Sequence, residues 1–305
     1  MGDEGRRFAG VDTSTPNLAR MHDYFVGGKD NFAADREAAE AVLAIAPEVR
    51  VMALEHQTFH VRVIRFLAEQ GITQFVNLGS GLPTEHNTHQ LARSLAPDAR
   101  VVYVANDPVV LTHGRAILAR EPGIVVVEGD VMHPADLLAD PLLQQTIDLD
   151  QPVAVLLFAV LQYIPDGSDP FRRVAELRDA LPAGSHVVIT HVVFDARPEI
   201  AEPLVDLYKK MLGDADGGAR TKEQVAPFFD GFQLVEPGLV YVRDWRPDTP
   251  FLPERSEKAW GWSWESAGSP RRPFGGFLGG LGPRSRATEW HGRVLSSSAG
   301  PSILL

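Results

Sequence analysis

The sequence predicts an α/β protein with a doubly wound, mostly parallel sheet. Short apolar runs alternate with helical segments from residue 73 onward. The run 152–158 is almost continuously apolar, which is typical of a strand in the centre of a parallel sheet. A further apolar run ends in Gly79-Ser80-Gly81 and is followed by a helix start, as in the first strand, turn and helix of a nucleotide-binding domain.

Residues 16–71 precede the sheet and are expected to form a cap of three helices. Pro16 suits a first helical position, and Asp30 or Asn31 can cap the second helix. Pro47 opens the third, whose apolar residues recur at helical spacing.

The remaining elements follow in order within a cofactor-binding domain of residues 72–250. Strands are expected at 73–78, 101–105, 124–127, 152–158 and 186–193. Helices are expected from Thr84, from Asp107-Pro108, between 134 and 147, from Asp169-Pro170, over 198–212 and from Thr221. Residues 232–235 and 239–242 are expected to form a closing antiparallel pair. The polar residues 1–15 are expected to be disordered. Residues 251–305, rich in Gly, Ser, Pro, Arg and Trp without a period, are expected to be an irregular tail.

Composition excludes several classes of function. The 305 residues are 44% hydrophobic and 23% charged, as in a soluble globular protein, and the net charge of −11 disfavours nucleic acid as a partner. The absence of cysteine excludes disulfides, thiolate metal sites and a cysteine nucleophile. No zinc-ligand spacing is visible, so no metal is expected. No apolar run approaches the roughly 20 residues of a membrane span, and no signal peptide is apparent, so we expect a cytoplasmic protein.

The glycine turn indicates which nucleotide the domain binds. A dinucleotide fold would have a third glycine where this chain has Thr84, and no Lys-Ser/Thr pair marks a phosphate-binding loop. Gly79, Ser80 and Gly81 therefore suit a ligand without a diphosphate, such as S-adenosylmethionine (SAM). An ordinary tight turn is the alternative.

Candidate cofactor residues follow the next two strands. Asn106 and Asp107 end the second strand, and Asp107 is the acid within reach of ribose hydroxyls, although Asp before Pro108 is also an ordinary helix cap. After the third strand, Asp130 could reach an adenine amino group and Val131 could pack on the ring. A loop aspartate ahead of a helix is the alternative for Asp130.

Candidate residues for the methyl-donor end and the chemistry follow the fourth and fifth strands. Ala159 and Gln162 lie after the fourth strand, and His191 ends the fifth. His191 is the candidate base, with a structural role as the alternative. Near the N-terminus, Tyr24 and Gly28 lie in a segment dense in glycine, aromatic and charged residues. This segment could be a lid over the cofactor or simply a connection between helices.

These motifs resemble a known family. The segment from Asp23-Tyr24 through Gly27-Gly28-Lys29-Asp30-Asn31-Phe32, the turn Gly79-Ser80-Gly81-Leu82-Pro83-Thr84 and the stretch Asn106-Asp107-Pro108 look like those of an actinobacterial SAM-dependent methyltransferase family, formerly domain of unknown function 574. The resemblance covers roughly residues 14–250. It implies a class I methyltransferase (Rossmann-like) fold, SAM as cofactor and an acceptor that the resemblance does not name.

The chain departs from the family pattern at two cofactor positions. Asn77 stands where the family usually has an acid before the glycine turn, and Ala105 stands where it has the ribose-binding aspartate. We expect a SAM-dependent methyltransferase acting on a small-molecule acceptor, with Asn77 among its cofactor residues. The alternatives are a catalytically silent SAM-binding regulatory relative and a nicotinamide-dependent oxidoreductase, against which the missing third glycine argues.

Overall fold

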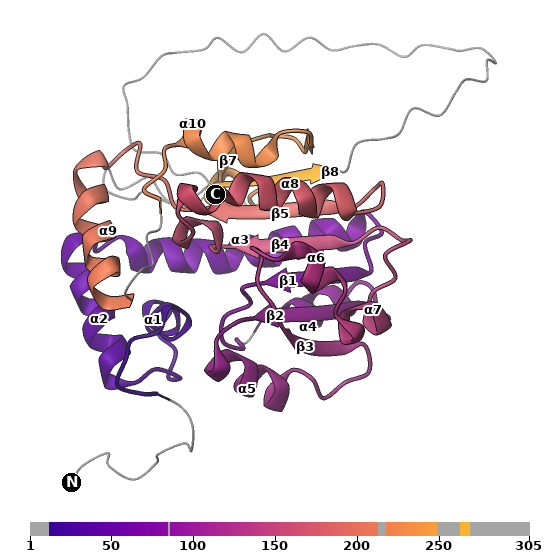
Figure 1. The fold of residues 1–305 in the computed structure, drawn as a ribbon, viewed down its shortest axis with the longest axis horizontal. Coiled ribbons are helices and arrows are strands. Elements are labelled where there is room, and N and C mark those ends of the chain that lie inside the picture. Colours follow the sequence, from indigo (N-terminus) through magenta and orange to yellow (C-terminus); the bar gives the residue numbers. More distant parts are fainter. Residues whose placement is uncertain (1–11, 85, 213–217, 249–262, 269–305) are drawn as a thin grey trace.

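A computed structural model describes residues 12–84, 86–212, 218–248 and 263–268 (Figure 1). The strands are β1 (Gln74–Leu78), β2 (Arg100–Ala105), β3 (Ile124–Glu128), β4 (Ala154–Phe158), β5 (His186–His191), β6 (Gln233–Leu234), β7 (Val240–Tyr241) and β8 (Ser263–Gly268). The α-helices are α1 (Leu18–Phe25), α2 (Ala33–Ile45), α3 (Val49–Glu69), α4 (Thr88–Arg93), α5 (Pro108–Ile117), α6 (Pro134–Leu138), α7 (Pro141–Thr146), α8 (Pro170–Ala180), α9 (Pro198–Leu212) and α10 (Lys222–Val225).

The strands form one sheet in the order β3-β2-β1-β4-β5-β8-β6, with β7 also paired to β8. Strands β1 to β5 are parallel, and β8 runs antiparallel to its neighbours. Every residue of β1 is buried, as are the first four of β4, because helices cover both faces. The doubly wound, mostly parallel sheet predicted from the sequence is confirmed.

The order of the strands creates a crevice. From β1 the chain moves outward through β2 to β3, then returns to place β4 on the other side of β1. The connections that leave β1 and β4 therefore diverge at the carboxyl edge of the sheet, which is where ligands bind in such folds.

Three helices lie beyond this carboxyl edge: the consecutive helices α1 and α2, and α9 from much later in the chain (Figure 1). They are here called the roof helices. Helix α2 packs against both α1 and α9. Helix α3 runs along one face of the sheet and α8 along the other (Figure 1). Two of the three predicted N-terminal helices, α1 and α2, thus stand over the crevice together with α9, which follows β5, whereas α3 lies along a face of the sheet.

Two helices begin later than predicted. Helix α1 begins after Asn17 and not at Pro16. The Asn17 side chain accepts hydrogen bonds from the amides of Ala19 and Arg20 and so caps the helix. Helix α4 begins after Asn87 and not at Thr84. The Asn87 side chain accepts a hydrogen bond from the Thr84 amide at 3.0 Å, so Thr84 lies in the connection that precedes the helix.

The cap of α2 also differs from the prediction. Phe32 precedes the helix, and its amide donates to the Asp35 carboxylate at 2.8 Å. Asp30 and Asn31, the predicted caps, are engaged elsewhere: the Asp30 amide and the Asn31 side chain both donate to Asp23 Oδ2. The positions of Asp30 and Asn31 in the sequence suit a cap. In the structure, however, both residues donate hydrogen bonds to the Asp23 carboxylate on α1.

The end of the sheet corrects two further predictions. Residues 232–235 and 239–242 contribute β6 and β7, but these strands pair with β8 and not with each other. Strand β8 itself lies within residues 251–305, which were expected to be irregular. An unpaired strand edge offers backbone donors and acceptors to any extended segment, so this pairing leaves little trace in side-chain composition. Residues 1–11, 249–262 and 269–305 lie outside the described part of the chain.

Candidate functional site

A cavity of about 790 Å³ lies at the carboxyl edge of the sheet, beneath the roof helices. The loops that follow β1, β2, β3, β4 and β5 all contribute to its wall, as do α1, α3 and α9. Its volume is within the usual range for small-molecule sites in proteins, and its position matches the crevice that the strand order creates.

The glycine turn after β1 forms the floor of this cavity. Gly79 and Gly81 both have positive φ, +73° and +63°. A Cβ on Gly79 would lie 2.3 Å from Val160 Cγ2, on the loop after β4, so glycine is needed for close approach as well as for conformation. The amides of Gly79 and Ser80 donate to the Val104 carbonyl, which fixes the turn against β2.

Asn77 borders the cavity just before this turn. Its Nδ2 donates to Thr88 Oγ1 at 3.1 Å, while its Oδ1 is buried and has no hydrogen-bond partner within the described residues. Asn77 therefore presents a hydrogen-bond acceptor at the cavity wall.

Asp107 joins three parts of the site. Its Oδ1 accepts from the amides of Val109 and Val110 at 2.8 and 3.0 Å, which makes it the N-cap of α5. Its Oδ2 accepts from Asn17 Nδ2 at 2.7 Å, and both Asp107 and Asn17 line the cavity. The capping alternative is therefore observed, and the carboxylate also borders the cavity beside Asn106.

Of the two candidates after β3, one lines the cavity. Asp130 does, and its Oδ1 accepts from the Met132 amide at 2.9 Å. Val131 is 3% exposed and belongs to the core, so it does not reach the cavity. Met132 lines the cavity in its place, because the loop turns between the two side chains.

The loop after β4 is held in shape by β5. Ala159, at φ +56°, donates its amide to Thr190 Oγ1 at 2.6 Å. Gln162 Oε1 accepts from the Val192 amide at 3.0 Å, and both Ala159 and Gln162 line the cavity. Gln162 therefore has a positioning contact that links the ends of β4 and β5.

His191 does not line the cavity, which removes it as a candidate base. Its ring is fully buried. Nδ1 lies 2.6 Å from the Val192 carbonyl, and Nε2 lies 2.8 Å from an Arg220 nitrogen, so one ring nitrogen donates and the other accepts. Burial and the neighbouring Arg220 charge lower the pKa of His191 to about 3. Its role is to receive Arg220, which also binds Asp166 and two carbonyls of the β4 loop.

Tyr24 and Gly28 also lie away from the cavity wall. The Tyr24 hydroxyl contacts Glu40, and Arg50 lies over its ring at 4.9 Å. Gly28 has no room for a side chain, because a Cβ would overlap the Asp23 carboxylate at 1.9 Å. In this segment Asp23, Phe25 and Val26 line the cavity.

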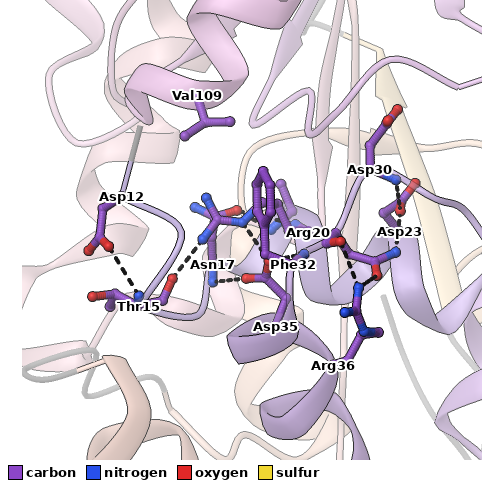
Figure 2. A network of polar contacts seen from close by, with 12 residues as sticks. Asp12, Thr15, Asn17, Arg20, Asp23, Asp30, Phe32, Asp35, Arg36 and Val109 are labelled. Carbon is purple, nitrogen blue, oxygen red and sulfur yellow. Dashed lines mark hydrogen bonds and ion pairs between the residues drawn. The ribbon is translucent and has the colours of Figure 1, made fainter. Parts of the chain in front are cut away.

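A buried ion pair holds the start of the chain in place, as Figure 2 shows. Asp35 Oδ2 accepts from Arg20 Nε at 2.7 Å, and the two side chains are 0% and 2% exposed. Asp35 Oδ1 also accepts from the Asn17 amide at 2.9 Å, and Arg20 donates to the Thr15 carbonyl. These bonds fix Asn17 where its side chain meets Asp107.

Three histidines at the cavity were not singled out by the sequence. His22 comes from α1, and His56 and His60 come from α3. The rings of His56 and His60 lie 5.4 and 5.2 Å from the Phe158 ring at the end of β4. The spacing of His56 and His60, one helical turn apart, was the available signal, but nothing in the sequence showed that α3 would lie against the carboxyl edge of the sheet.

Burial keeps these imidazoles uncharged. It lowers the pKa of His22 and of His60 to about 4, and that of His56 well below its usual value. Within the described residues no group of three or more His, Asp or Glu side chains has a metal-binding arrangement. None of the described helices is long and apolar enough to cross a membrane.

A parallel sheet in the order 3-2-1-4-5, with a glycine turn at the switch point and helices before the first strand, defines the class I methyltransferase fold. The sequence profile described as S-adenosyl methyltransferase matches residues 5–268, and the chain belongs to this family. The methyl donor of the family is S-adenosylmethionine.

Two solved structures support this membership. A protein of the domain of unknown function 574 family from Streptomyces avermitilis is 35% identical, with a TM-score of 0.80 over 85% of this chain and 99% of that one. A protein from Thermobifida fusca is 42% identical, with a TM-score of 0.78 over 85% and 97% of the two chains. No curated protein matches this sequence.

The two glycines of the turn give a first prediction. Gly79→Ala should lose about 2–3 kcal/mol more stability than Gly81→Ala, because both acquire left-handed strain but only the first also meets Val160. Urea unfolding of both variants measures the difference, and equal losses would contradict the close approach.

The buried ion pair gives a second prediction. Asp35→Asn should cost about 3–5 kcal/mol, because it leaves the Arg20 charge buried without a counter-charge. The control is Asp169→Asn, since the Asp169–Arg172 pair is 56% exposed on both sides and should contribute less than about 1 kcal/mol. Similar losses in urea unfolding for the two variants would argue against the structural role of Asp35.

The histidines give a third prediction, on stability against pH. The pKa values of His22, His60 and His191 are lower in the folded protein, so the unfolded chain binds more protons between about pH 4 and 6.5. Stability should therefore fall as the pH drops through this window, by on the order of 2 kcal/mol per histidine at pH 5. Thermal unfolding at pH 5 and pH 7 tests this, and equal melting temperatures would contradict it.

Proposed function

We propose that the protein transfers the methyl group of SAM to a small-molecule acceptor. The observation that carries this proposal is the cavity of about 790 Å³, which joins the glycine turn of β1 to a chamber covered by the roof helices. A large substrate would have to displace those helices, whereas a small one fits beneath them. The net charge of −11 also disfavours a nucleic-acid acceptor.

The residues at the floor suit the parts of SAM. Glycine at positions 79 and 81 lets the backbone approach the ligand, and Asn77 Oδ1 is an acceptor without a donor. Asp107 and Asp130 each offer a carboxylate oxygen beyond the one that holds the local turn. In this proposal Asp107 and Asn106 take the ribose side and Asp130 with Met132 takes the adenine side.

Catalysis then depends mainly on position. SAM supplies a methyl group on a cationic sulfur, which reacts with a nucleophile held in line with it. Gln162 and the backbone at Ala159 shape the wall after β4, and the roof helices lie over the carboxyl edge of the sheet. Tyr163 and Tyr208 face each other across this region with ring centroids 5.9 Å apart, and burial raises the pKa of both hydroxyls.

One observation favours a second candidate, a SAM-binding protein without turnover. Ala105 cannot hydrogen-bond a ribose, and Asp107 Oδ2 already accepts from Asn17. Such a protein would regulate through a partner. Tight SAM binding with no methyl transfer to any of a broad set of small acceptors would support it.

Calorimetric titration with SAM and with its demethylated product tests the cofactor site. Asp107→Asn keeps a good helix cap but loses the charge, so affinity should fall about 10- to 100-fold. The matched control is Asp169→Asn, because Asp169-Pro170 also caps a helix, α8, and Asp169 lies outside the cavity wall. No binding to the unmodified protein up to millimolar SAM would overturn the proposal, and equal affinity of the two variants would remove Asp107 from the site.

A further inference from the structure

The three histidines at the cavity are not equivalent, because His56 is tied to strand β5 and His60 to helix α4. His56 Nε2 lies 3.2 Å from Thr190 Oγ1, and that oxygen already accepts the Ala159 amide. The Thr190 hydroxyl can therefore donate its hydrogen to His56 Nε2. His60 Nε2 lies 3.0 Å from Thr88 Oγ1, which accepts from Asn77 in the same way.

His22 is the third histidine, and it has no such tie. Leu18, His22 and Phe25 line the cavity at helical spacing, so α1 presents one face to it. The His22 ring meets the edge of the His56 ring at 6.3 Å. Within the described part of the chain, neither ring nitrogen of His22 has a hydrogen-bond partner, so an imidazole that can accept a proton borders the chamber unused.

The walls of the cavity indicate what can bind there. Phe25, Phe158, Phe194 and Tyr208 supply aromatic surface, and no lysine or arginine is among the described lining residues. The protein therefore offers an anionic acceptor, such as a carboxylate or phosphate, no cationic side chain as a counter-charge. An aromatic ring with an uncharged polar group suits these walls.

The unused imidazole narrows the acceptor further. A neutral amine can attack a methyl group through its lone pair, but a hydroxyl must lose its proton as it reacts. We propose that His22 accepts this proton from the hydroxyl of a neutral aromatic alcohol, a phenol-like acceptor. This inference rests on the proposed methyl transfer and names the substrate class and the base.

The step balances as follows. The acceptor oxygen forms a bond to the methyl carbon while the methyl–sulfur bond breaks, and the sulfur keeps that electron pair. The hydroxyl proton passes to a ring nitrogen of His22 and is later released to water. The sulfur loses its positive charge as His22 gains one, so the cavity carries one positive charge before and after. Burial, which keeps His22 uncharged in the free protein, therefore opposes the step less than it opposes simple protonation.

The test uses the full chain loaded with S-adenosylhomocysteine and the fluorescent probe 2-naphthol, with 2-naphthoate as the anionic counterpart. His22→Gln keeps a hydrogen-bond acceptor but cannot take a proton, and His22→Leu removes both properties. His113→Gln, on α5 and outside the cavity wall, is the control. Fluorescence titration gives probe affinity independently of turnover.

We expect 2-naphthol to bind more tightly than 2-naphthoate. His22→Leu should weaken naphthol binding about tenfold, while His22→Gln and His113→Gln leave it unchanged. With SAM, His22→Gln should lower kcat for naphthol methylation about 100-fold or more with little change in KM.

Three results would overturn the inference: no naphthol binding by the loaded protein, unchanged binding in His22→Leu, or an unchanged kcat in His22→Gln. Titration with S-adenosylhomocysteine separates these from a failure of the proposed function. If no form of the protein binds it, the methyltransferase proposal falls. If every form binds it equally, the variants are folded and only the assignment of His22 and its acceptor is at stake.

Discussion

The buried carboxylate of Asp35 is the contact on which the enclosed site depends. It accepts from the Arg20 guanidinium and from the backbone amides of Asn17, which precedes α1, and Phe32, which precedes α2. A buried ion pair is tolerated only when its remaining hydrogen-bonding capacity is used, and here backbone donors use it. Because the carboxylate belongs to α2, it fixes α1 relative to α2, and α1 brings both Asn17 and His22 to the cavity wall.

Polar side chains, as well as apolar packing, fix the helices on the carboxyl edge. His56 and His60 join α3 to Thr190 in β5 and to Thr88 in α4. Arg220 joins the loop after β4 to β5 through His191. Hydrogen bonds of this kind are directional, so they define one register where apolar contact alone would allow sliding. Their histidines must remain neutral to serve, and burial ensures it.

Local signals in the sequence predicted the parallel sheet, the glycine turn and the helix starts at Asp107-Pro108 and Asp169-Pro170. These features depend on residues close together in the chain. The contacts that complete the site do not. Asn17 meets Asp107 across 90 positions, and His56 meets Thr190 across 134. His191 followed a strand end as expected but turned into the core, because Arg220, 29 positions later, takes its free nitrogen. Strand β8 is defined by backbone pairing, which its side chains did not indicate.

The bond between Asn17 and Asp107 couples the start of the chain to whatever occupies the cavity. A ligand that takes Asp107 Oδ2 exchanges its own donor for the Asn17 amide, so its gain is the difference between two hydrogen bonds and not the whole of one. Thermodynamic reciprocity then relates two effects. Ligand binding favours the loosened α1 by the same factor by which loosening α1 raises the affinity for the ligand. For such a ligand the first helix is a competitor, and the stability of that helix sets part of the ligand's affinity.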